Sequence, residues 1–198
     1  EMRNDSNIII RNLTLQNLVG DHSKGILVVC DIGHQAQNIT LKNLIIRNIS
    51  WTSNFNDVPH GENTHPIVVH GFGSTLLTTL SNITIDSCQV YNNATGYSEA
   101  IGMDGNIDGV IISNNLVHDN TNIGIDIMGN YAVSAEPTLD QVRNGKVIGN
   151  ICYNNISNVA TSAGIYVDGA KNITVERNIT YSNGHGIEIG CEKDGSAS

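Results

Sequence analysis

The chain has 198 residues and a formal net charge of −9, because 19 Asp and Glu stand against ten Lys and Arg. So few cations argue against a nucleic-acid surface, which needs clustered Lys and Arg. No run of about 18 apolar residues occurs, so no membrane span is expected. The length suits one domain, residues 1–198.

Paired asparagines recur along the chain with near-regular spacing. A first column contains Asn12, Asn43, Asn115, Asn150 and Asn178, with Cys88 in its third position, and a second column five residues later contains Asn17, Asn48, Asn93, Asn120, Asn155 and Asn183. The spacings within the first column are 31, 45, 27, 35 and 28 residues. One short unit therefore recurs six times with two insertions, which is typical of a solenoid.

Each unit also contains short strand-like runs with a period of two. In chain order, the runs of one kind begin at Gly25, Pro66, Ala100, Gly124, Gly164 and Gly186, and those of another kind include residues 38–43, 82–87, 109–114 and 172–178. Several short strands in every unit, without helical periodicity, predict an all-β fold. We expect a single-stranded right-handed parallel β-helix of about six coils.

The four cysteines do not suit a disulfide framework. The repeat places Cys30 and Cys191 five coils apart and Cys88 and Cys152 two coils apart. Those separations exceed the roughly 7 Å between Cα atoms that a disulfide allows. We expect four free, mostly buried thiols.

The strand alternation predicts which side chains face outward beside the Gly-apolar runs. One outward column contains Leu27, Val68, Gly102, Asp126, Tyr166 and Glu188, and the next contains Val29, His70, Asp104, Met128, Asp168 and Gly190. Glu99 and His185 lie one alternation earlier. Acidic residues on neighbouring strands repel and Asp is disfavoured in strands, so this strip indicates a functional site. The alternative is an ordinary solvated face.

Two insertions, residues 51–64 and 130–144, flank the predicted strip. Long loops on a regular scaffold often carry function. Trp51 and Tyr131 lie in these loops, and we expect both, with Arg143, to bind substrate. The alternative for the first loop is that its aromatic residues anchor the loop itself. His118 shares a position with Leu15, Ile46, Tyr91, Tyr153 and Tyr181, which predicts a side-chain stack rather than a catalyst.

These motifs resemble the pectate-lyase-like superfamily of parallel β-helix proteins, whose members mostly act on polysaccharides. Residues 122–126 are similar to a calcium motif of family 9 polysaccharide lyases, of which only Asp126 is retained. Residues 184–190 look like a motif of family 28 polygalacturonases, but the coil before it lacks the expected Asp pair at residues 163–166. The resemblance covers all six coils and implies the fold more strongly than an activity.

The leading functional hypothesis is a polysaccharide lyase that cleaves a uronic-acid-containing glycan by β-elimination. Carboxylates select calcium, so Asp104, Asp126 and Asp168 are the predicted Ca²⁺ ligands. The predicted catalytic residues are Tyr166, His185, Glu188 and Lys171, and the predicted substrate-binding residues are Trp51, His70, Glu99, Tyr131 and Arg143.

Three alternatives stay open: a glycoside hydrolase that uses paired carboxylates, a uronate epimerase, and a non-catalytic glycan-binding or structural rod. The resemblance implies a secreted or cell-surface protein. No polar cap is visible at either end, so we expect the chain to be part of a longer solenoid or to stack on another chain.

Overall fold

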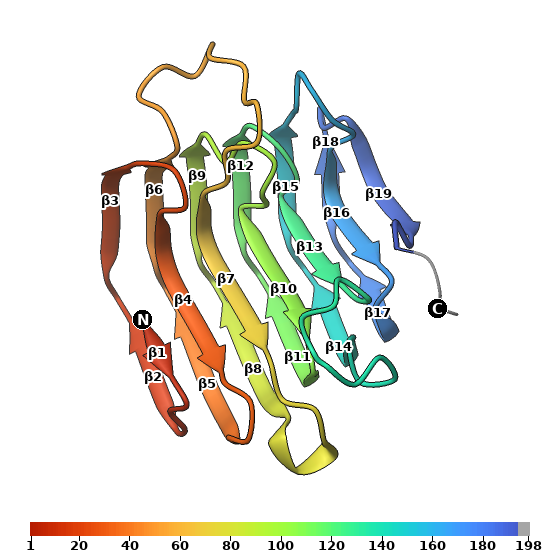
Figure 1. Ribbon diagram of the computed structural model, residues 1–198. Helices are drawn as coiled ribbons and strands as arrows, with labels where there is room; N and C mark the ends of the chain where they lie inside the picture. The colour runs from red at the N-terminus through yellow and green to blue at the C-terminus, as the bar shows by residue number, and fades with distance from the viewer. Residues whose placement is uncertain (194–198) are drawn as a thin grey trace.

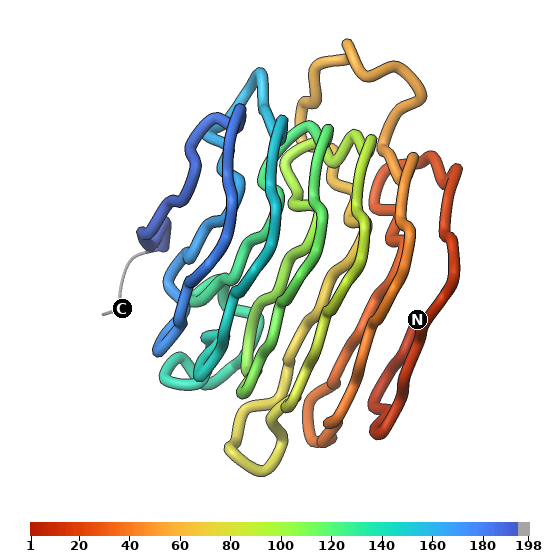
Figure 2. The backbone as a smooth tube through the Cα atoms, turned by 180° about the vertical axis from the view of Figure 1, so that it is seen from behind, coloured from red at the N-terminus to blue at the C-terminus, as the bar shows by residue number. Residues whose placement is uncertain are grey.

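A computed structural model describes residues 1–193 and shows a parallel β-helix, as the repeats predict. The chain winds through three parallel sheets and advances by one strand of each sheet per coil (Figure 1). The first coil therefore lies at one end of the rod and the last described coil at the other (Figure 2). Among the described residues no helix is long enough and apolar enough to cross a membrane.

Sheet A has seven parallel strands and includes the Gly-apolar runs of the repeat. Its strands are β1 (Met2–Arg3), β4 (Lys24–Cys30), β7 (His65–Gly71), β10 (Ile101–Gly105), β13 (Ile125–Met128), β16 (Ala163–Asp168) and β19 (His185–Gly190).

Sheets B and C have six parallel strands each. Sheet B contains β2 (Ile8–Arg11), β5 (Ala36–Lys42), β8 (Leu80–Asp86), β11 (Ile107–Ser113), β14 (Val142–Ile148) and β17 (Lys171–Glu176). Sheet C contains β3 (Thr14–Val19), β6 (Ile45–Ser50), β9 (Gln89–Asn93), β12 (Leu116–Asn120), β15 (Ile151–Asn155) and β18 (Ile179–Tyr181). One short 3₁₀ helix, η1 (Leu76–Thr78), lies between β7 and β8.

The core fills the interior of the coils with the inward side chains of all three sheets. Ile125 and Ile127 of β13 lie in it, while Asp126 between them projects outward. Cys30, Cys88 and Cys152 are buried thiols without disulfides, as predicted, and Cys191 is half-buried. Apolar contact between successive coils therefore stabilises the scaffold that carries the outer face.

The asparagine columns form hydrogen-bonded ladders, but one feature of the predicted alignment is wrong. In the later coils the side chains of Asn93, Asn120, Asn155 and Asn183 form a buried ladder at 2.7–3.0 Å. In the second coil Asn48 does not bond the buried Asn93; it accepts a bond from Asn92, the exposed residue just before Asn93. Asn17 and Asn48 have a left-handed backbone, as Asn92 does, so their column is displaced by one residue from the buried ladder.

The other column is displaced in the same way. Asn12 and Asn43 are left-handed and exposed, whereas Leu13 and Leu44 align with Cys88 and with the buried ladder of Asn115, Asn150 and Asn178. A left-handed turn residue comes just before each position of this row. Asparagine suits both places, because it tolerates the left-handed conformation and bonds along the ladder.

His118 lies in a ring stack on sheet C, as predicted. Its ring is stacked between those of Tyr91 and Tyr153 with centroids 4.9 and 4.7 Å away, and Tyr181 continues the stack. The pairing register puts Gln16 and Arg47 in this row instead of Leu15 and Ile46, which is the same one-residue displacement.

The two insertions lie at opposite ends of the strands of sheet A: the first leads into β7 and the second follows β13. Residues 51–64 lie between β6 and β7, and residues 129–141 lie between β13 and β14 (Figure 1). Exposed apolar side chains occur on the end coils, among them Ile9, Ile179 and Ile189. Stacking of these coils on further structure stays a prediction, and residues 194–198 lie outside the described part of the chain.

Candidate functional site

The outer face of sheet A brings together acidic side chains from successive strands. Strand pairing aligns Gly102, Asp126, Tyr166 and Glu188 in one row, as the alternation predicts. His70 pairs with Asp104, and Met128 pairs with Asp168, in the neighbouring row. We call this surface the acidic strip; it comprises Glu99, Asp104, Asp126, Asp168 and Glu188, with the His and Tyr side chains that contact them.

The acidic strip differs from the solvated face considered as an alternative, because its central acids are buried. Asp126 is 2% exposed, Asp168 is fully buried and Glu99 is 9% exposed. Burying a carboxyl group without a partner is costly, so each group needs a neutralising proton, a hydrogen bond or a ligand. The three acids meet this requirement in different ways.

Asp104 forms a close pair with His70. The Asp104 Oδ1 atom lies 2.5 Å from the His70 Nδ1 atom, and both side chains are largely buried. A carboxylate at Nδ1 fixes the orientation of an imidazole ring and selects the tautomer whose Nε2 accepts a proton. The pair can therefore act as a positioned base.

Glu99 lies over Gly102 and faces His65. Burial is the main cause that raises the pKa of Glu99 to about 8, and burial lowers the pKa of His65 to about 3. Their contact of 3.6 Å is therefore between two neutral groups rather than an ion pair. A Cβ atom added to Gly102 would lie 2.9 Å from Glu99 Oε2, so the missing side chain makes room for this carboxyl group.

Asp126 is the central acid and has an unpaired oxygen. Burial, followed by the charges of Glu99 and Asp168, raises its pKa well above the usual range. Its Oδ1 atom is one of four buried side-chain atoms without a hydrogen-bond partner among the described residues; the others belong to His65, Thr95 and Asn122. All four lie on β7 and β13 or on the turns that lead into sheet A, so the buried polar atoms without partners are concentrated at sheet A and its entry turns.

Asp168 is fully satisfied by the second insertion and by the segment after β19. Tyr131 donates its hydroxyl hydrogen to Asp168 Oδ2, and the backbone N–H of Glu192 donates to Oδ1 at 2.8 Å. Burial, and then the bond to Asp168, raises the pKa of Tyr131. Tyr166 is 4% exposed, and burial raises its pKa as well. Both phenols are thus held as proton donors.

His185 and Glu188 lie together on β19. The His185 Nδ1 atom is 3.1 Å from Glu188 Oε2, and His185 is the more exposed of the two. Glu188 pairs in register with Tyr166, so these residues form the edge of the acidic strip.

Three predicted site residues are not brought to the acidic strip. Lys171 begins β17 in sheet B, and Arg143 lies on β14 of the same sheet, where it bonds Asp108 at 3.1 Å and Asn106 at 2.9 Å. Trp51 lies at the edge between sheets C and A. The sequence predicts that Trp51 and Arg143 lie at the strip because both belong to the insertions that flank it. An insertion can, however, point away from the sheet that it flanks.

Sequence reasoning assigned no functional role to His65, Gly102 or Asn122. His65 is the first residue of β7, one alternation before the predicted columns, and it could have been paired with Glu99 from that position. The roles of Gly102 and Asn122 depend on the packing of Glu99 and on buried atoms, which spacing alone does not reveal.

The three predicted calcium ligands, Asp104, Asp126 and Asp168, have different surroundings in the described part of the chain: two are engaged in separate contacts, and Asp126 has an oxygen without a partner. Within residues 1–193 no three His, Cys, Asp or Glu side chains are arranged as a metal-binding group. Asp104 is bonded to His70, and Asp168 to Tyr131 and Glu192, so the three predicted ligands do not converge on one point. Calcium stays a prediction, and the chemistry proposed below makes no use of it.

Comparisons with known proteins support the fold. No protein-family model matches the chain. The uncharacterized protein YwoF of Bacillus subtilis (strain 168) is 35% identical over 195 residues, which cover 95% of this chain and 39% of that protein. The chain thus spans about two fifths of the length of this curated relative.

Two solved structures are similar in shape. The A-module of Azotobacter vinelandii mannuronan C-5 epimerase AlgE4 superposes with a TM-score of 0.52 and 12% identity, covering 98% of this chain and 58% of that one. The A-module of AlgE6 from the same organism gives a TM-score of 0.47 and 16% identity, with 98% and 55% coverage. At such identities the likeness to AlgE4 concerns the parallel β-helix fold alone.

Proposed function

We propose that the protein is a carbohydrate-active enzyme that removes the C5 proton of a uronic acid residue in a polysaccharide. The observation that carries this proposal is the His70–Asp104 pair next to the buried acids Glu99 and Asp126, and burial raises the pKa of both acids. Proton removal beside a carboxylate needs a base and a group that neutralises the carboxylate. The acidic strip offers both on one face.

In this mechanism His70 Nε2 takes the C5 proton, and Asp104 positions the ring and stabilises the imidazolium that forms. The C–H electron pair moves into the uronate carboxylate. Glu99 or Asp126, still protonated, donates a hydrogen bond to the carboxylate oxygen on which charge accumulates. Such donors act best where water is excluded, because the low dielectric strengthens the bond.

The electron pair then returns in one of two ways. In the lyase reaction it forms the C4–C5 double bond while the C4–O bond breaks, and a phenol such as Tyr131 or Tyr166 gives its proton to the leaving oxygen. In the epimerase reaction C5 takes a proton on the opposite face and no bond of the chain breaks. We favour the lyase, and the named activity of the structural neighbour AlgE4 makes the epimerase the second candidate.

The test is to incubate the protein with polyuronates in D₂O, with and without added Ca²⁺, and to analyse the products by proton NMR. Deuterium at C5 or an unsaturated uronate end is expected. Asp104→Asn and His70→Gln should each lower the rate at least about 100-fold while the circular dichroism spectrum is retained. Lys171→Ala on sheet B is the matched control and should keep full activity.

Two outcomes contradict the proposal. Absence of both C5 exchange and unsaturated products with every polyuronate would remove the assigned chemistry. New reducing ends without a double bond would indicate hydrolysis by paired carboxylates instead.

A further inference from the structure

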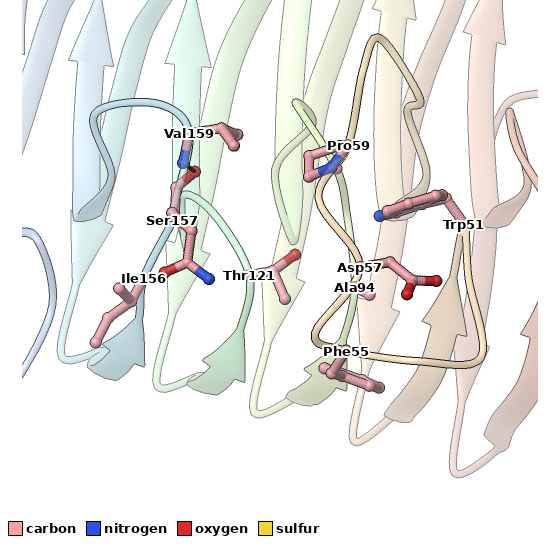
Figure 3. A pocket seen from close by; sticks show the side chains of 11 residues that line it. Trp51, Phe55, Asp57, Pro59, Ala94, Thr121, Ile156, Ser157 and Val159 are labelled. Atoms are coloured by element: carbon pink, nitrogen blue, oxygen red, sulfur yellow. Dashed lines mark hydrogen bonds between the residues drawn. The ribbon is translucent and has the colours of Figure 1, made fainter.

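A second hollow lies at the edge where the chain passes from sheet C to sheet A. The insertion 51–64 stands on one side and the loop 156–162 on the other (Figure 3). Thr121, on the short turn between β12 and β13, lies between the two loops in the same view. The two long loops thus form the walls of a hollow above a short turn.

The walls of this hollow are apolar and aromatic, with polar groups between them. Its apolar lining comes from Trp51, Phe55, Pro59, Ile156 and Val159, and its polar lining includes Thr121, Ser157 and Asn158. This hollow is narrow, with a cavity volume of about 30 Å³, and it opens to solvent. Phe55, Thr121, Ile156 and Asn158 also line a wider, more open hollow over the outer face of sheet C, so the two are continuous. The wider hollow has a volume of about 840 Å³, which lies within the range of small-molecule sites, roughly 300–1,000 Å³.

The insertion is held in place by bonds at both of its ends. The Trp51 N–H donates to the Ala94 carbonyl at 3.0 Å, and the Tyr97 N–H donates to the Glu62 carbonyl at 3.0 Å. Inside the loop Asp57 accepts bonds from the side chains of Thr52 and Asn54. A site already built before binding loses less conformational entropy when a ligand enters.

The charge of the hollow selects against anionic ligands. The described lining includes Asp57 and Asp119 and contains no Lys or Arg. Asp119 is bonded to His118 and to Asn154, which hold its carboxylate in place at the surface. A uronate would meet acidic groups here, whereas a neutral sugar offers an apolar ring face to aromatic side chains and hydroxyl groups to Asn, Ser and Thr.

We propose that these two continuous hollows, which together we call the edge site, bind a neutral glycosyl unit such as a hexose or N-acetylhexosamine residue. The sugar ring packs against Phe55, which lines both hollows, and Asn158 and Thr121 bond its hydroxyl or amide groups. Trp51 lies in the adjoining narrow hollow. The edge site is separate from the acidic strip and does not depend on the chemistry assigned to the strip.

The protein offers a direct probe, because Trp51 is its one tryptophan. The experiment titrates the protein with cellobiose, mannobiose and N,N′-diacetylchitobiose and follows the tryptophan fluorescence. At least one neutral disaccharide should give a saturable change, and Phe55→Ala should weaken that binding at least tenfold. Asn158→Ala should weaken it severalfold, which separates loss of the aromatic wall from loss of a polar contact.

Two controls keep the result specific. Leu77→Ala removes an exposed apolar side chain, 81% accessible, outside the lining of the edge site and should leave binding unchanged. Asp126→Asn alters the acidic strip and should also leave it unchanged, even if the enzyme activity is lost. The proposal is overturned if no neutral disaccharide gives saturation, if an oligouronate binds more tightly than all of them, or if folded Phe55→Ala binds as tightly as the parent protein.

Discussion

Gly102 leaves the space that the Glu99 carboxyl group occupies. A methyl group at this position would lie 2.9 Å from Glu99 Oε2, closer than ordinary contact. We expect Gly102→Ala to displace Glu99, to lower the free energy of unfolding by about 1–3 kcal/mol and to lower activity at least tenfold. Thermal unfolding and the NMR assay measure the two effects.

A double-mutant cycle identifies the clash. In a Glu99→Ala background the conflicting oxygen is gone, so Gly102→Ala should cost less stability than it does in the parent protein. Equal costs in both backgrounds would show that Glu99 is not the group being displaced.

The proton on Glu99 makes stability depend on pH. Its pKa is about 8 in the folded protein and 4.5 when unperturbed, so between these values the folded state binds a proton that the unfolded state lacks. The free energy of unfolding should therefore fall as pH rises from about 5 to about 8, with an upper limit of about 5 kcal/mol from this group. Denaturant titrations at several pH values measure the slope.

The variant Glu99→Gln keeps the shape and removes the titration. Its stability should change less over the same pH range. An unchanged slope would assign the pH dependence to another group, with Asp126→Asn as the next variant to test.

Among the structural elements, the buried asparagine ladder connects neighbouring coils. Asn120 accepts a bond from Asn93 at 2.7 Å and donates to Asn155 at 2.8 Å, and it is 3% exposed. Asn120→Ala would leave buried amide groups on both neighbours without partners, so we expect a loss of about 3 kcal/mol or more. Chemical denaturation measures this loss.

The exposed ladder provides the comparison. Asn172 is exposed, has a φ of 55° and donates to Asn144 at 3.2 Å. Asn172→Gly removes this amide but tolerates the backbone conformation, so it should cost less than about 1 kcal/mol. Similar losses for Asn120→Ala and Asn172→Gly would contradict the distinction between the two ladders.

At the scale of the whole molecule, the net charge of −9 opposes an anionic polysaccharide. Added NaCl screens this repulsion, since the Debye length falls to about 8 Å near 0.15 M. We expect KM for a polyuronate to fall severalfold between about 0.01 and 0.15 M NaCl, whereas disaccharide binding at the edge site should not change. A KM that rises with salt would indicate a local cationic binding surface instead.

The same assay isolates the calcium prediction. At matched ionic strength, Ca²⁺ should give no more than the gain from NaCl if screening alone is at work. A further gain that a chelator reverses would support ions bound to the acidic strip or to the substrate.

The sequence predicts the coils and the outward rows of sheet A because alternation and repeat length are local properties. It misplaces the early asparagines by one residue, since a left-handed Asn12 or Asn43 and a buried Asn115 look alike in a sequence. It also misses that Asp126 and Asp168 are covered. These acids are buried because the insertion with Tyr131 and the segment at Glu192 cover the strands, and no local sequence pattern specifies that covering.

The turn from sheet C to sheet A is only residues 182–184 in one coil and residues 51–64 in another, yet the strands on both sides keep parallel pairing. The length of the loop at this corner therefore does not affect the stacking of the coils, as expected when each coil contacts only its neighbours. A foreign peptide inserted at the exposed residues 60–61 of the longer loop should therefore be displayed at this corner without disturbing the scaffold. Parallel β-helices of this kind can in this way gain new binding specificities by changing the loop at a corner rather than a strand of a sheet.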